Sequence, residues 1–183
     1  MDRVVVCGCG PSVELMAAVH MNFVTVGCND VDRWFPPNHL VLGDRLSCYH
    51  GDRRKTIQGT GARTVWLRRG DSLGHRDERE IEVLEVHDQR VTPSMLDEGP
   101  LISFLMTPYL AIHLAYRLGA RRIGLLGVDL VSPSPLRFHH GVISRKLSEL
   151  AEALAAKSVE LGNLSSISQV VGLPAMDLQG FAT

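Results

Sequence analysis

The sequence predicts a single α/β domain whose sheet is mainly parallel and carries helices on both faces. Short apolar runs alternate along the chain with stretches of helical periodicity. The apolar runs are continuous in Val, Ile and Leu, as in parallel strands that are buried on both faces, whereas half-exposed antiparallel strands would alternate with polar residues. The chain has 183 residues, of which 45% are hydrophobic and 21% charged. This composition suits one compact core built from residues 1–183.

Six apolar runs are expected to form the strands. Each run is short and is bounded by polar or turn-forming residues. The six are Arg3 to Cys7, Phe23 to Val26, His39 to Leu42, Thr64 to Leu67, Ile81 to Val86 and Arg122 to Leu126. The glycine-rich and charged residues 69–80 are predicted to form an exposed loop.

Three further segments have the pattern of helices. The first begins near Glu14, directly after a glycine turn. The second opens at Thr107-Pro108, because Thr is a good cap and Pro is favoured at the first helical position. The third is predicted over Ile143 to Leu161, where leucines recur at helical spacing and a glycine follows as the C-terminal cap.

The charge balance argues against a protein that grips long nucleic acid through its phosphates. The chain has 19 Lys and Arg residues against 20 Asp and Glu residues, a formal charge of −1, whereas such a protein needs a strongly basic surface. A small-molecule partner is therefore expected. No apolar run approaches the ~20 residues of a membrane-spanning helix, and the apolar start Val4-Val5-Val6 breaks into glycines, unlike a signal sequence. We expect a cytoplasmic protein, and the sequence leaves its oligomeric state open.

The four cysteines are expected to be reduced thiols, mostly buried as small apolar residues. Cys7, Cys9, Cys28 and Cys48 all lie in the first third of the chain. A zinc site is the alternative, but no pair has the usual spacer of two to four residues. We therefore predict no metal-ligating residues among them.

Polar side chains follow the predicted strands at the points where the strands end. Ser12 comes after the first strand, Asn29 and Asp30 after the second, Asp44 after the third, and Asp129 after the sixth. In an open α/β sheet the ligand lies beyond the carboxyl ends of the strands, where loops present free backbone amides and helix N-termini. These residues therefore predict a ligand site at that edge.

The turn at residues 8–12 lets the backbone approach a ligand closely, and Ser12 is placed to cap the following helix. The dinucleotide-binding pattern needs a third glycine, but Val13-Glu14-Leu15 occupies that turn, so a standard NAD site is disfavoured. A Walker pattern is also absent from the sequence. A tight turn without a ligand remains an alternative for this loop.

Several runs of residues are similar to one known family. They are Val4 to Ser12, Val26 to Asn29, Leu118 to Ala120 and Ile123 to Asp129. In these runs the chain resembles the Rossmann-like bacterial sialyltransferases and their relatives, which include phage proteins of unknown role and 6-hydroxymethylpterin diphosphokinase-like proteins. The resemblance implies a Rossmann-like fold and a nucleotide-sugar-dependent glycosyltransferase, with a CMP-sugar as the favoured donor.

The resemblance assigns the nucleotide to the first glycine loop and to the Cys-Asn pair after the second strand. Cys9 stands where the family commonly has Asn, so one hydrogen-bonding side chain is absent. Thr107 keeps a hydroxyl before the long helix and would either bind a sugar or phosphate or simply cap that helix. The predicted nucleotide-binding residues are Gly8, Cys9, Gly10, Pro11, Ser12, Asn29, Asp44, Thr107 and Asp129.

The resemblance also implies a histidine base immediately before the last long helix, where His140 stands. A sugar hydroxyl is a very weak acid, and a histidine with its ordinary pKa of ~6.5 can accept the proton near neutral pH. His139 is the second candidate, and His50, after the third strand, is a rival. The family's phosphate-holding tyrosines have no counterpart after the sixth strand, so Arg137 is the candidate clamp for the leaving phosphate. Residues 130–141 should form a loop or a lid.

Two other functions stay open at this point. Asp44 and Asp129, if they lie at neighbouring strand ends, would hold Mg²⁺ against a pyrophosphate and support pyrophosphoryl transfer from ATP. Asp129 would instead cap its own loop if its carboxylate bonds to the backbone. A binding module that keeps the nucleotide cleft without turnover is the third reading, because a fold does not establish an activity.

Overall fold

The computed structural model describes residues 2–17, 19, 22–86, 89–131 and 138–182. Its centre is a seven-stranded sheet in the order β5-β4-β3-β2-β1-β8-β9, and every pair of neighbouring strands runs parallel. The strands are β1 (Arg3–Cys7), β2 (Val24–Cys28), β3 (His39–Val41), β4 (Thr64–Arg68), β5 (Glu78–Ile81), β8 (Arg122–Leu126) and β9 (Glu160–Asn163). A separate parallel pair joins β6 (Val83–Glu85) to β7 (Leu101–Ser103). The predicted α/β fold with a parallel, Rossmann-like sheet is confirmed.

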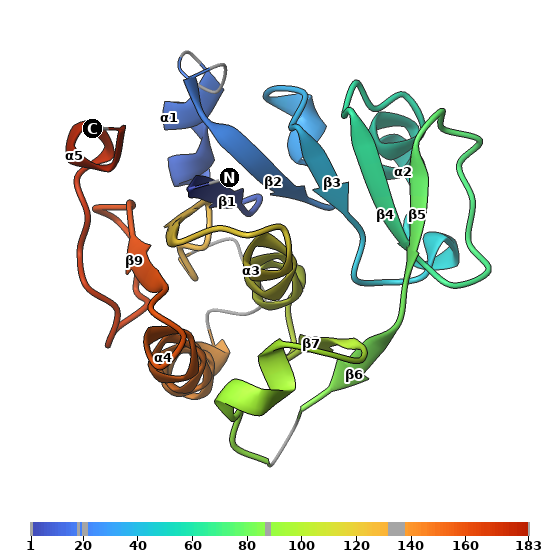
Figure 1. The fold of residues 1–183 in the computed structure, drawn as a ribbon. Helices are drawn as coiled ribbons and strands as arrows, with labels where there is room; N and C mark the ends of the chain where they lie inside the picture. Colours follow the sequence, from blue (N-terminus) through green and yellow to red (C-terminus); the bar gives the residue numbers. More distant parts are fainter. Residues whose placement is uncertain (1, 18, 20–21, 87–88, 132–137, 183) are drawn as a thin grey trace.

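Helices cover both faces of the sheet (Figure 1). The helices are α1 (Glu14–Ala17), α2 (Gly51–Gln58), α3 (Thr107–Arg117), α4 (His140–Ala155) and α5 (Leu178–Ala182). Helices α3 and α4 share one core with Val4 and Val6 of β1, while α1, α2 and α5 share the other core with Val5 and Cys7. Successive residues of a strand point to opposite faces. A central strand such as β1, with a core on each side, therefore has apolar side chains at all of its fully buried positions, Val4 to Cys7.

Two predicted elements differ from the structure. The run from Ile81 to Val86 is split between β5, which begins earlier at Glu78 and pairs with β4, and β6, which pairs with β7. The last long helix does not reach Leu161. It ends at Ala155, Ser158 takes a left-handed backbone with φ of 58°, and Leu161 lies in β9 beside β8. Pairing with β8 therefore outweighs the helical spacing of the leucines.

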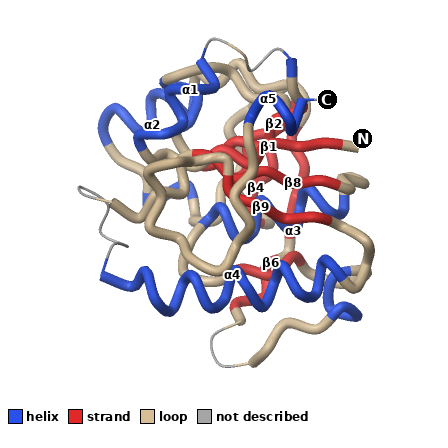
Figure 2. The backbone as a smooth tube through the Cα atoms, turned by 90° about the vertical axis from the view of Figure 1, so that its left-hand side faces the viewer, coloured by secondary structure: helices blue, strands red, loops and turns tan. Residues whose placement is uncertain are grey.

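The β8–α4–β9 connection fixes where α4 begins. Because β8 and β9 are parallel neighbours, the helix between them must run back across the sheet, from its carboxyl edge to its amino edge. Figure 2 shows α4 as a long helix running along the sheet. The first residue of α4, His140, is thereby placed at the carboxyl edge.

His113 in α3 is fully buried and joins two segments beside the small sheet. Its Nδ1 accepts a hydrogen bond from the backbone N–H of Ile102 at 2.9 Å, and its Nε2 lies 2.9 Å from the carbonyl oxygen of Leu96. Burial lowers the pKa of His113 from 6.5 to about 4. This histidine is therefore neutral at pH 7 and has a structural role.

Acid should destabilise the protein through His113. The unfolded chain takes up a proton near pH 6.5 and the folded chain only near pH 4, so the stabilisation is complete above pH 6.5 and is lost as the pH falls toward 4. The loss reaches about 3 kcal/mol, since one pKa unit corresponds to ~1.4 kcal/mol. Urea unfolding at pH 7 and pH 5 checks this, with His113→Gln as the control because glutamine retains one acceptor and one donor. An equal loss of stability in both proteins would contradict the prediction.

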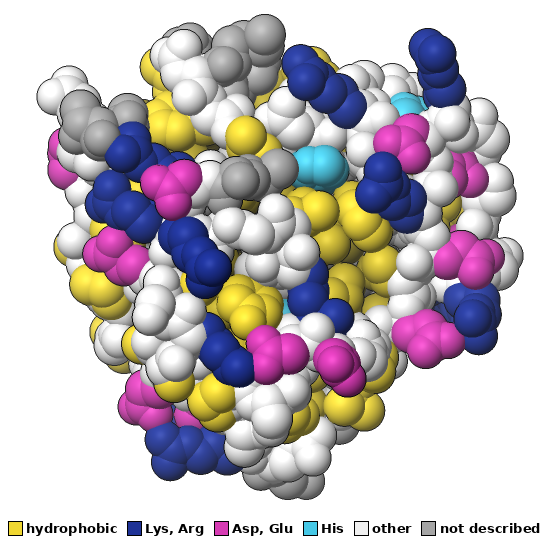
Figure 3. All heavy atoms as spheres, in the orientation of Figure 1, with side chains coloured by type: hydrophobic (Ala, Val, Ile, Leu, Met, Phe, Trp, Pro, Cys, Tyr) yellow, Lys and Arg dark blue, Asp and Glu magenta, His cyan; other side chains and the backbone are white. Residues whose placement is uncertain are grey.

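Basic and acidic side chains are interspersed on the face drawn in Figure 3. The described residues include exposed ion pairs, such as Arg69 with Glu82 at 2.9 Å. Exposed pairs of this kind contribute little stability. None of the helices in the described part of the chain has the length and apolar character that a membrane crossing requires.

Candidate nucleotide-binding site

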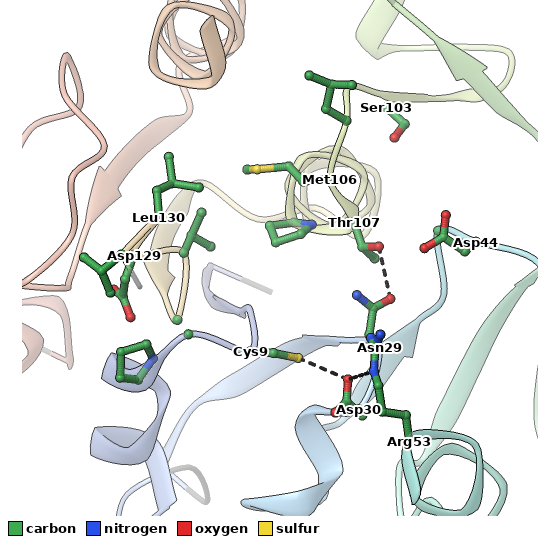
Figure 4. Close-up of a pocket in the computed structure, with 18 of the residues that line it drawn as sticks. Cys9, Asn29, Asp30, Asp44, Arg53, Ser103, Met106, Thr107, Asp129 and Leu130 are labelled. Carbon is green, nitrogen blue, oxygen red and sulfur yellow. Dashed lines mark hydrogen bonds and ion pairs between the residues drawn. The ribbon is translucent and has the colours of Figure 1, made fainter. Parts of the chain in front are cut away.

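A cavity of about 780 Å³ opens at the carboxyl ends of β1, β2, β3 and β8, against the start of α3 (Figure 4). It occupies the sheet edge at which the sequence predicts that the polar strand-end residues meet. Its polar lining consists of Asn29, Asp30, Arg33, Asp44, Arg53, Arg68, Glu85, Ser103, Thr107 and Asp129. The remaining lining comprises Cys9, Gly10, Pro11, Gly43, Leu105, Met106, Pro108, Gly127, Val128, Leu130 and Val131.

The turn after β1 is held by hydrogen bonds to the turn after β8. The Asp129 carboxylate, 1% exposed, accepts the backbone N–H of Ser12 at 2.8 Å, the Ser12 hydroxyl at 2.7 Å and the Ser165 hydroxyl at 2.6 Å. The Ser12 hydroxyl also accepts the backbone N–H of Gly127 at 2.7 Å. The prediction that Ser12 caps the following helix is therefore wrong. Ser12 lies within a short 3₁₀ turn, and its hydroxyl bonds to Gly127 and Asp129 in the loop after β8.

Close backbone packing explains the glycines of this turn. A Cβ atom on Gly10 would lie 2.7 Å from the Gly127 carbonyl oxygen and 2.7 Å from Asp129 Oδ2. A Cβ atom on Gly8 would also collide with the Gly127 carbonyl group. Gly8 and Ser12 thus hold the turn in place, while Cys9, Gly10 and Pro11 line the cavity. Direct contact of these residues with a nucleotide stays a prediction.

Asn29 follows β2 in a left-handed backbone, with φ of 54°. Its side-chain oxygen accepts the hydroxyl of buried Tyr49 at 2.7 Å and the hydroxyl of Thr107 at 3.1 Å. With the oxygen occupied in this way, the amide nitrogen is the group turned toward the cavity (Figure 4). Thr107 accordingly does not cap α3, whose N-cap is Met106, and its hydroxyl orients Asn29 instead.

Asp30 is the buried centre of an ion cluster that the sequence did not reveal. Its carboxylate is 3.0 Å from Arg53 Nε and 3.6 Å from Arg33 Nη1, and both arginines line the cavity with half-exposed side chains. The arginines come from segments whose charge pattern resembles an ordinary solvated face. Arg33 is only three residues from Asp30 in the sequence, whereas Arg53 meets Asp30 only through the fold, so no local sequence signal identifies Arg53.

Cys9 lies beside this cluster as a protonated thiol. Its Sγ is 3.2 Å from the Cys28 carbonyl oxygen and 3.7 Å from Asp30 Oδ1. Burial raises the pKa of Cys9 to about 12, and the Asp30 carboxylate acts in the same direction. A thiol needs to ionise to act as a nucleophile, so Cys9 serves as a small lining group. All four cysteines are free, and among the described residues no group of three or more His, Cys, Asp or Glu side chains could hold a metal ion.

Asp44 and Asp129 do not lie at neighbouring strand ends, contrary to the premise of the pyrophosphate reading. Asp44 follows β3 and Asp129 follows β8, with β2 and β1 between them, a separation of about 14 Å at ~4.8 Å per strand. Figure 4 shows them on opposite sides of the cavity. The Asp129 carboxylate is also occupied by three hydrogen bonds. The structure therefore does not bring these two carboxylates together around one Mg²⁺.

Among the described residues, His139 and His140, two of the three predicted catalytic residues, do not line the cavity. His139 precedes α4 and His140 begins it, both with exposed side chains at the carboxyl edge. Arg137 lies outside the described residues, as does most of the expected lid at 130–141. Their catalytic roles stay predictions.

No family model matches the chain, and no curated protein matches it significantly. Solved structures do match. The sialyltransferase CstII from Campylobacter jejuni, in complex with the substrate analogue CMP-3FNeuAc, superposes with a TM-score of 0.56 at 11% sequence identity, covering 100% of this chain and 88% of that chain. The chain is similar in fold to a sialyltransferase.

The same values hold for CstII in complex with cytidine-5'-monophosphate. A point mutant of the alpha-2,3/8-sialyltransferase CstII gives a TM-score of 0.55 at 12% identity, over 100% of this chain and 89% of that chain. The structural likeness thus confirms the resemblance seen in the glycine loop and the strand-end motifs. At such low identity it establishes the fold, and the activity has to be argued from the site.

Proposed function

We propose that this protein is a nucleotide-sugar-dependent glycosyltransferase that uses a CMP-sugar donor. The observation that carries the proposal is the fixed Asn29 amide at the carboxyl edge, in a fold similar to that of CstII, which binds CMP and a CMP-sugar analogue. A nucleotide lying along this edge meets the backbone of the glycine loop and the donor group of Asn29. Gly10, Pro11, Asp44 and Thr107 complete the proposed nucleotide contacts.

The side-chain amide of Asn29 is held in one orientation before any ligand binds. Tyr49 and Thr107 hold its oxygen from two different segments, so the amide does not lose rotational freedom when a ligand binds. An amide N–H is a donor and suits a ribose or phosphate oxygen. Half-exposed Arg33 and Arg53 add positive charge on the same side of the cavity, partly balanced by Asp30.

In the proposed reaction, a hydroxyl of the acceptor attacks the anomeric carbon of the donor sugar. The bond from that carbon to the phosphate oxygen of CMP breaks, and the hydroxyl proton passes to His140. His140 is the proposed base because α4 starts at the carboxyl edge, and His139 is the alternative. Arg137 is the proposed clamp for the leaving phosphate, since a guanidinium pairs well with phosphate oxygens.

The experiment for this function is a thermal-shift screen with CMP, UDP, GDP and ATP, with and without Mg²⁺, followed by donor hydrolysis and transfer assays. A stabilisation specific to CMP, together with slow hydrolysis of a CMP-sugar, is the expected result. Binding of ATP only, with strict dependence on Mg²⁺, would instead indicate pyrophosphoryl transfer. Binding of CMP without any turnover would indicate a nucleotide-binding module.

Replacing Asn29 by Asp should weaken CMP binding by at least about tenfold. Aspartate keeps an oxygen for Tyr49 and Thr107 and tolerates the left-handed backbone, but it removes the amide donor and sets a negative charge against the phosphate. Isothermal titration calorimetry measures the change. Asn22→Asp, an exposed position outside the cavity lining, is the control for the added charge. Unchanged affinity in Asn29→Asp would remove Asn29 from the site.

A further inference from the structure

We propose that the cavity contains a second, apolar subsite, formed by Leu105, Met106, Leu130 and Val131, that holds an alkyl or aromatic group of the acceptor. The inference rests on the proposed glycosyltransferase function and specifies the acceptor: a hydroxyl compound that carries an apolar substituent. These four apolar residues come from two separate loops and all line the cavity.

Unusual backbone conformations are concentrated around the cavity. Among the described residues, four non-glycine residues have positive φ angles, and three of them, Asn29, Leu105 and Leu130, line this cavity. Asn tolerates that conformation, but leucine does so rarely. Strained residues of this kind gather at ligand sites, where the surrounding structure holds them in place.

Leu105 has the clearest geometry of the three. The backbone N–H of Met106 donates to the carbonyl oxygen of Phe104 at 2.6 Å, which closes a three-residue turn around Leu105 with φ of 52°. A γ-turn with a positive central φ is rare and strained. Glycine would adopt it without strain, whereas leucine at this position presents an apolar side chain to the cavity at a conformational cost.

Exposure distinguishes Leu105 from the other apolar residues of the proposed subsite. Leu105 is 47% exposed although it lines the cavity, whereas Met106 and Leu130, which also line it, are nearly buried. In Figure 4, Met106 and Leu130 lie on one side of the cavity, and Asn29, Asp30 and Arg53 lie on the other. Asp129 lies beside Leu130, but its carboxylate is buried and engaged by Ser12 and Ser165. We call the Met106 and Leu130 side the apolar half of the cavity and the opposite side the polar half. A ligand that fills both needs a polar part and an apolar part.

The nucleotide is assigned to the polar half because its ribose and phosphate need donors and charges, which Asn29, Arg33 and Arg53 supply. The apolar half then faces the second substrate. Contact with an apolar substituent would remove the exposed Leu105 side chain from water, and this is favourable in proportion to the apolar area covered. The base of the nucleotide is the competing occupant, and the experiment separates the two.

The test compares two probes with the same sugar, n-octyl β-D-galactopyranoside and methyl β-D-galactopyranoside, by calorimetry below the micelle concentration, with and without saturating CMP. We expect the octyl compound to bind the unmodified protein at least about tenfold tighter, since each buried methylene contributes several-fold. Leu105→Ser should reduce this preference to less than about threefold. Leu15→Ser, at an exposed leucine of α1 outside the cavity, should keep it.

Equal affinity for the two probes, or no binding of either, would overturn the apolar subsite. The same conclusion would follow if Leu105→Ser weakened CMP binding instead, because the base would then occupy the apolar half. If CMP bound neither the unmodified protein nor the variants, the proposed function would be rejected. The apolar subsite would still be tested, because the two galactosides are also compared without CMP. Leu105→Gly excludes a folding defect: it should lose the octyl preference without a lower melting temperature, because it relieves the strained turn.

Discussion

Replacing Asp129 by alanine should lower the free energy of unfolding by about 4 kcal/mol. The carboxylate is buried and accepts three hydrogen bonds, two from Ser12 and one from Ser165. A hydrogen bond to a charged group contributes about 1.5–3 kcal/mol, and water from the adjacent cavity can replace only part of the lost set. Urea unfolding followed by circular dichroism measures the change.

Asp44→Ala is the matched control for Asp129→Ala, because it removes an exposed carboxylate from the same cavity. We expect a stability change within about 0.5 kcal/mol for it, as for most surface substitutions. A change in Asp129→Ala as small as that in Asp44→Ala would mean that the link between the β1 and β8 loops contributes little. Asp129→Asn should fall between the two, since its amide can accept from Ser12 or Ser165 but presents a donor toward the others.

Replacing His140 by alanine should reduce turnover of the cognate CMP-sugar and acceptor by about 10²–10⁴-fold, the usual contribution of a general base. The affinity for CMP should remain unchanged, because His140 lies at the start of α4 and does not line the described cavity. Steady-state transfer kinetics and calorimetry with CMP measure the two effects separately. A base removed in this way lowers kcat without changing ground-state nucleotide binding.

His139→Ala is the control, since its side chain is equally exposed and adjacent in sequence. Nearly normal turnover in His140→Ala, with CMP affinity unchanged, would reject His140 as the base. A large loss in His139→Ala alone would transfer the role to that residue. Proportional losses in both variants would indicate that the two histidines act together on the acceptor.

Local sequence predicts the central strands well because a central parallel strand has a core on both sides. Arg3–Cys7 and Arg122–Leu126 match their predicted bounds for this reason. The edge strand β5 was not predicted, since Glu78-Arg79-Glu80 is polar and pairs on one side only. β9 was hidden because Leu161 continues the leucine spacing of α4, and only pairing with β8 makes it a strand.

The sequence predicts those residues of the candidate site whose place in the chain, at a strand end or a helix start, already indicates where they lie in the fold. Asn29 follows a strand end, as the strand-end argument predicts, and Thr107 begins the long helix to which the family resemblance drew attention. Their mutual hydrogen bond joins residues far apart in sequence. Tyr49 and Arg53 gave no signal, because their partners Asn29 and Asp30 are brought to them by the fold. The left-handed Leu105 was equally unforeseeable, since leucine has no preference for that conformation.

The hydrogen bonds between Ser12 and Asp129 join residues 117 positions apart. A chain leaving the ribosome completes β1, β2 and β3 long before β8 exists, so β1 first has a partner on one side only. Until residue 129 has emerged, the turn at Gly8–Ser12 lacks the acceptor that holds it. The loop proposed to bind the nucleotide is therefore made first and ordered among the last, and ligand binding cannot assist the early steps of folding during synthesis.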